Sequence, residues 1–151
     1  MIERPVDGAK ARGRTVLQGG RAKAYRPLPA EARRRAFDAA LAAYERGDFF
    51  EAHELLEPAW MGTRDLAERE LLQGLIKLAA AFVHAARGNA AGVTKNLRGA
   101  RERLASAGDA GRRFGIDGPG LFAAIDARLA SPIEVDDPPI AISRADAGGA
   151  S

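Results

Sequence analysis

The sequence predicts a single all-α domain of about five helices, and three observations carry this prediction. Apolar residues make up 46% of the 151-residue chain, and alanine supplies many of them while β-branched residues are few. This balance favours helices over strands. Apolar side chains recur at helical spacing through most of the chain. Glycines and capping residues separate the periodic segments, which is typical of antiparallel helical hairpins packed into one bundle.

The N-terminal part of the chain differs from the rest in charge and pattern. Residues 1–26 are rich in glycine and arginine without sustained periodicity, so we expect a disordered leader. Residues 1–35 carry a net charge of +7, from 10 Lys or Arg and 3 Asp or Glu, whereas the remainder carries −4. A basic arm can bind nucleic acid. Because Tyr25 is the one aromatic residue in the leader, a solvated arm is the simpler interpretation.

The first predicted helix spans residues 29–46. Pro29 suits a first helical turn, and Gly47 can take the left-handed conformation that ends a helix. Between them one face is apolar, through residues that recur at helical spacing: Ala36, Phe37, Ala40, Leu41 and Tyr44.

The second predicted helix begins at Asp48 and ends near residue 61. Glu51 follows Asp48 by three residues, as in a capping box. Pro58 removes one backbone hydrogen bond and should bend the helix or fray its last turn. One face carries most of the apolar side chains: Phe49, Ala52, Leu56, Ala59 and Trp60.

The third predicted helix begins after Thr63 or Asp65, either of which can cap it, and extends to about Arg87. It is apolar over more than half of its circumference, so we expect it in the middle of the bundle. A polar stripe remains, formed by Glu70, Gln73, Lys77 and His84.

Two further helices complete the prediction. Asn89 caps a fourth helix, which is followed by a loop over residues 108–115. Asp117 caps a short fifth helix. We therefore place the folded domain at residues 27–130 and a disordered tail at 131–151, where proline, aspartate and glycine are frequent.

Composition also bears on location. The chain has no cysteine, which excludes disulfides and thiolate metal sites and fits a reducing cytoplasm. No apolar run reaches the length needed to span a bilayer, and the first residues lack a signal-peptide core. We therefore expect a cytoplasmic protein with no membrane partner.

The second helix holds the residues best suited to chemistry, His53, Glu54 and Glu57. Residues four apart share a helical face, so His53 and Glu57 could bind one ion. Imidazole with carboxylate suits zinc, iron or manganese. The pattern is one residue short of the His-Glu-x-x-His zinc motif, so a third ligand must come from elsewhere. His84 is the only other histidine, and Glu70 and Gln73 on the same neighbouring helix are further possible partners.

The same residues have a purely structural interpretation. A histidine next to Trp60 on an apolar face is often a core residue that hydrogen-bonds a carboxylate. The stripe on the third helix can simply be its solvated side. The small residue Gly74 beside Gln73 favours a pocket instead. The predicted lining of this pocket is Trp60, Glu70, Gln73 and Lys77.

Three blocks of the chain match a known pattern in order and spacing. They read FFEAHExxExxW at residues 49–60, QGLIxxAAAFxH at 73–84, and GN at 88–89. Over residues 34–105 the chain thus resembles the family called domain of unknown function 309. Pro58 departs from the family pattern. The resemblance implies packed helical hairpins and, from a label sometimes given to the family, a metal-dependent hydrolase. The matching polar or aromatic positions are His53, Glu54, Glu57, Trp60, Gln73 and His84.

Two hypotheses about function follow. In the first, His53, Glu57 and His84 hold a divalent metal such as zinc, manganese or iron, which activates water with Glu54 as the base. In the second, the protein is a non-catalytic helical interaction or scaffold module in which these residues are structural. The ligand, whether a small molecule or a protein, and the formation of a homo-oligomer are left open.

Overall fold

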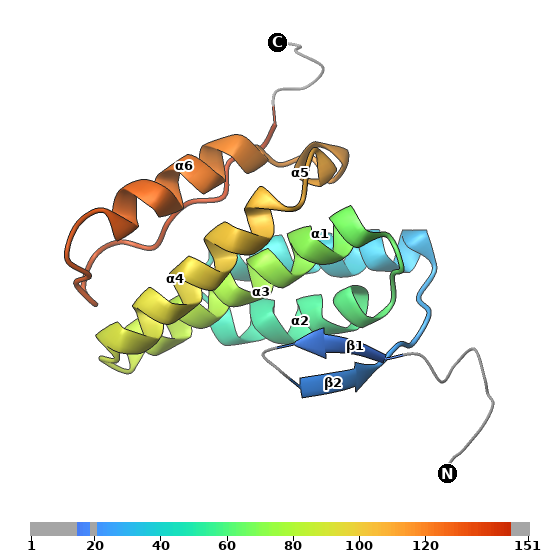
Figure 1. Ribbon diagram of the computed structural model, residues 1–151, viewed down its shortest axis with the longest axis horizontal. Coiled ribbons are helices and arrows are strands. Elements are labelled where there is room, and N and C mark those ends of the chain that lie inside the picture. Colours follow the sequence, from blue (N-terminus) through green and yellow to red (C-terminus); the bar gives the residue numbers. More distant parts are fainter. Residues whose placement is uncertain (1–14, 19–20, 146–151) are drawn as a thin grey trace.

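The computed structural model describes residues 15–18 and 21–145, with side chains from residue 25 onward. These residues form a bundle in which α1 and α2 make one hairpin and α3 and α4 a second (Figure 1). α3 packs against both α2 and α4, and α6 packs against α4. The helices are α1 (Ala30–Glu45), α2 (Phe49–Met61), α3 (Leu66–Ala86), α4 (Ala90–Ala105), α5 (Ala110–Arg113) and α6 (Gly118–Leu129).

The predicted all-α bundle is confirmed, and α3 is its central helix. Eleven of the 21 residues of α3 are buried, more than in any other described helix. A helix apolar over so much of its surface must be covered on several sides, and its neighbours α2 and α4 do this. The described helices contain none long and apolar enough to cross a membrane.

Glycines at two helix corners take the predicted left-handed conformation. Gly47 has φ of 83° between α1 and α2, and Gly88 has φ of 73° between α3 and α4. Side chains other than glycine rarely adopt this region, so each glycine allows a tight helical reversal.

Three of the predicted N-caps form their hydrogen bonds. The side chains of Asp65, Asn89 and Asp117 each accept the backbone N–H three residues further on. Asp48 is the residue before α2 but its side chain accepts no such bond, so the predicted capping box does not form there. Pro58 lies on the exposed side of α2, and the helix continues past it to Met61.

The C-terminal boundary of the domain lies further along the chain than predicted. The predicted loop at 108–115 contains the one-turn helix α5. Beyond α6, Ile140 and Ile142 are buried in the core, and the Tyr44 hydroxyl donates a 2.6 Å hydrogen bond to the Ile140 carbonyl. Part of the predicted tail thus packs on the bundle through Ile140 and Ile142, while residues 146–151 lie outside the described residues.

The predicted leader contains a two-stranded antiparallel hairpin. Strand β1 (Thr15–Gln18) pairs with β2 (Arg21–Ala24) (Figure 1). The sequence between the strands is Gly-Gly, a pair common in tight hairpins. Both strands fall within the predicted leader, and residues 1–14 and 19–20 lie outside the described part.

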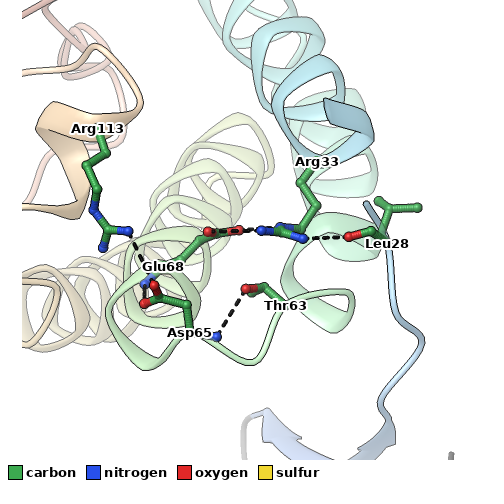
Figure 2. A network of polar contacts seen from close by, with 6 residues as sticks. All are labelled: Leu28, Arg33, Thr63, Asp65, Glu68 and Arg113. Atoms are coloured by element: carbon green, nitrogen blue, oxygen red, sulfur yellow. Dashed lines mark hydrogen bonds and ion pairs between the residues drawn. The ribbon is translucent and has the colours of Figure 1, made fainter. Parts of the chain in front are cut away.

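A polar network joins the start of the domain to α3 (Figure 2). The Arg33 guanidinium on α1 contacts the Glu68 carboxylate at 2.5 Å and donates to the Leu28 carbonyl. Asp65, which caps α3, receives a 3.3 Å contact from Arg113 of α5. The backbone N–H of Glu68, with help from Arg113, holds the pKa of Asp65 below its usual value.

Candidate functional site

The outer face of α2 presents four of the motif residues together. Phe50, His53, Glu54 and Glu57 follow the spacing i, i+3, i+4 and i+7, which places them on one side of the helix. The Phe50 side chain is 60% exposed to solvent. Its ring lies nearly parallel to the His53 imidazole, with 6.5 Å between centroids. His53 Nδ1 lies 3.3 Å from a carboxylate oxygen of Glu54.

Trp60 belongs to the core and does not line an open pocket. Its side chain is 1% exposed and joins the central cluster of apolar residues. Leu56 and Ala59 are buried on the same side of α2. The motif on α2 therefore serves two surfaces, with the tryptophan directed inward and the face of Phe50 directed outward.

The polar stripe predicted on α3 is divided among separate partners on or next to α4. Glu70 accepts from Arg103 at 3.3 Å. At the other end of α3, His84 Nδ1 lies 3.1 Å from the side-chain nitrogen of Asn89. A Cβ at Gly92 would lie 2.5 Å from this His84 atom, so the histidine packs directly on the glycine at the start of α4.

Gln73 and Lys77 occupy the middle of this stripe. Gln73 is 3% exposed, and its amide nitrogen has no hydrogen-bond partner in the described part of the chain. Lys77 is half-buried beside α4. Burial, together with the nearby cations Arg103 and Lys95, lowers the pKa of Lys77.

The structure does not bring the predicted metal ligands together. Among the side chains described from residue 25 to 145, no three His, Asp or Glu groups are close enough to hold a metal ion. His84 is packed at the corner between α3 and α4, whereas His53 lies on the outer face of α2 beside Phe50. The triad of His53, Glu57 and His84 hypothesised from the sequence is therefore not assembled in the described part of the chain.

Two features of the surface were not predicted from the sequence. One is the exposure of Phe50, which is not among the residues of the predicted apolar face of the second helix. The other is a cluster of cations along α4, including Lys95 and Arg98, near Lys77. The spacing of these two residues, three apart on a helix, was the available signal for the cluster.

The chain is a small bundle of helical hairpins, and its polar motif lies on α2 and α3. The family model Domain of unknown function (DUF309) matches residues 37–96, which takes in most of α1, all of α2 and α3, and the first part of α4. The match supports the predicted resemblance to this family over that segment. Neither the curated proteins nor the solved structures contain a significant match to the chain.

Proposed function

We propose that this protein is a non-catalytic helical interaction module that binds a cationic segment of another protein through the outer face of α2. The observation that carries the proposal is the exposed ring of Phe50 beside acidic side chains. Aromatic side chains such as phenylalanine are enriched at protein–protein interfaces relative to the rest of the surface.

The negative charge of α2 favours a positively charged partner. The helix contains three glutamates and no lysine or arginine, and Glu51 and Glu54 are exposed. An arginine or lysine placed over the Phe50 ring would gain a cation–π interaction of about 0.5–1 kcal/mol at such an exposed position. Neighbouring carboxylates would add ion pairs that weaken with salt. The expected affinity is therefore modest and sensitive to ionic strength.

Removing the aromatic ring and the acid should weaken binding of an arginine-rich peptide. We expect Phe50→Ala to reduce the affinity for a fluorescein-labelled oligo-arginine peptide about threefold, and Phe50→Ala with Glu54→Gln about tenfold. Fluorescence anisotropy at two salt concentrations measures this.

The matched control for this experiment is Asp38→Asn, which removes an exposed carboxylate from α1. This variant should leave the peptide affinity unchanged if the peptide binds at α2. If the peptide were held only by the net charge of the protein, loss of any carboxylate would weaken binding equally. Equal weakening by the control and by the α2 variants would contradict the proposal, as would failure of the peptide to bind.

A metal-dependent hydrolase remains the second candidate, favoured by the contact between His53 and the carboxylate of Glu54. Such a contact orients an imidazole, as it does around many metal sites. We expect zinc-loaded and dialysed protein to retain well under one metal per chain by elemental analysis, and His53→Ala to change this little. Stoichiometric zinc that is lost in His53→Ala would favour the hydrolase over the interaction module.

A further inference from the structure

An open cleft of about 590 Å³ lies along α4 next to α3, and none of the α2 residues of the proposed binding face lines it. Four cationic side chains line it, against one carboxylate, that of Glu102. Arg103 is partly neutralised by its contact with Glu70. The other cations, Lys77, Lys95 and Arg98, form no ion pair within the described residues 25–145.

Because Gly99 has no side chain, it leaves room for the Lys77 side chain in this cleft. A Cβ at residue 99 would lie 2.6 Å from the Lys77 Cδ and 3.2 Å from its Cε. The lysine stem thus lies across the glycine, between the two helices. Glycine inside a helix costs about 1 kcal/mol relative to alanine. Here that cost is offset by room for a charged side chain, which holds the ammonium group in the cleft.

We propose that this cleft binds a small multivalent phosphate anion, either free diphosphate or the diphosphate group of a nucleotide. Several cations around one open concavity attract an anion of high charge density, and lysine ammonium groups are common phosphate ligands. Burial and like charges disfavour the charged form of Lys77 in the unliganded protein. A bound anion would relieve that repulsion, so binding is coupled to the charge of the lysine.

The test is titration calorimetry with inorganic pyrophosphate. We expect Lys77→Met, which keeps the apolar stem and removes the charge, to weaken binding about tenfold or more, because hydrogen bonds to charged groups are the strong ones. Lys95→Met changes an exposed position and should weaken pyrophosphate binding severalfold. If Lys77→Met alters the circular dichroism spectrum, the Lys95→Met variant is the test of the proposal. Arg35→Gln on α1 is the control and should bind as the unmodified protein does.

Comparison of ligands separates the two sources of diphosphate. Binding of a nucleoside diphosphate tighter than pyrophosphate supports the nucleotide, and equal binding supports the free anion. Pyrophosphate binding that is absent, or equally weakened by Arg35→Gln, overturns the proposal. A single-stranded RNA oligomer that binds far more tightly than either small ligand also overturns it, because the cleft would then be part of a nucleic-acid surface.

Discussion

Trp60→Ala is expected to lower the free energy of unfolding by about 3–5 kcal/mol. The indole is 1% exposed and lies in the central apolar cluster, to which all six described helices contribute, so its removal leaves a large cavity. A small domain has a total stability of about 5–15 kcal/mol, and this variant loses a large share of it. Urea denaturation followed by circular dichroism gives the change as a shift in midpoint at constant slope.

The comparison variant for Trp60→Ala is Phe50→Ala on the same helix. Both remove an aromatic side chain of the same motif, but Phe50 is 60% exposed and its loss should change stability by about 0.5 kcal/mol or less. Similar costs for the two variants would show that the motif does not divide into an inward and an outward side. The pair of variants thus tests the placement on which the proposed function depends.

Glu68→Gln is expected to destabilise the protein by about 3 kcal/mol. The side chains of Arg33 and Glu68 are 18% and 6% exposed, so the glutamine would leave the guanidinium largely buried without its counter-charge. The carbonyl of Leu28 remains as an acceptor for Arg33, which keeps the effect at the lower end of the usual range. Chemical denaturation at neutral pH and low salt measures the loss.

Two comparisons identify the cause of that loss. Replacing Arg33 and Glu68 together by methionine should recover most of the stability, because no unpaired charge is left in the interior. Asp126→Asn breaks the Arg101 pair, which has a good 2.7 Å geometry but side chains 37% and 57% exposed, and should cost less than about 1 kcal/mol. A large effect of Asp126→Asn would mean that burial does not set the energy of these pairs.

The helices could be predicted from the sequence because their signals are local. The polar caps Asp65, Asn89 and Asp117 and the corner glycines Gly47 and Gly88 act within a few residues of themselves. Apolar periodicity then fixes which face of each helix is buried. These signals do not depend on which helices are neighbours, so one sequence suffices to find them.

The parts that were missed depend on contacts between distant segments. Helix α5 is four residues long, too short for a hydrophobic period, and has no side-chain cap. Ile140 and Ile142 stand among prolines and aspartates, and only their packing against the bundle makes them core residues. The composition of the segment indicated disorder, whereas tertiary burial determines its conformation.

The candidate site was only partly predictable for the same reason. The spacing of His53 and Glu57 correctly placed both on one side of α2, but spacing within a helix does not say what the neighbouring helix presents to them. His84, on the polar stripe of α3, packs against α4 instead. The resemblance supplied the motif residues and the family, and geometry separated the tryptophan in the core from the phenylalanine on the surface.

The bond from the Tyr44 hydroxyl to the Ile140 carbonyl spans almost the whole domain in sequence. During synthesis, α1 through α4 leave the ribosome well before the segment that carries Ile140 and Ile142. Until that segment emerges, the apolar surface that these isoleucines cover in the folded bundle remains open to water. A nascent chain at this stage is therefore a natural client for a chaperone that recognises exposed apolar side chains.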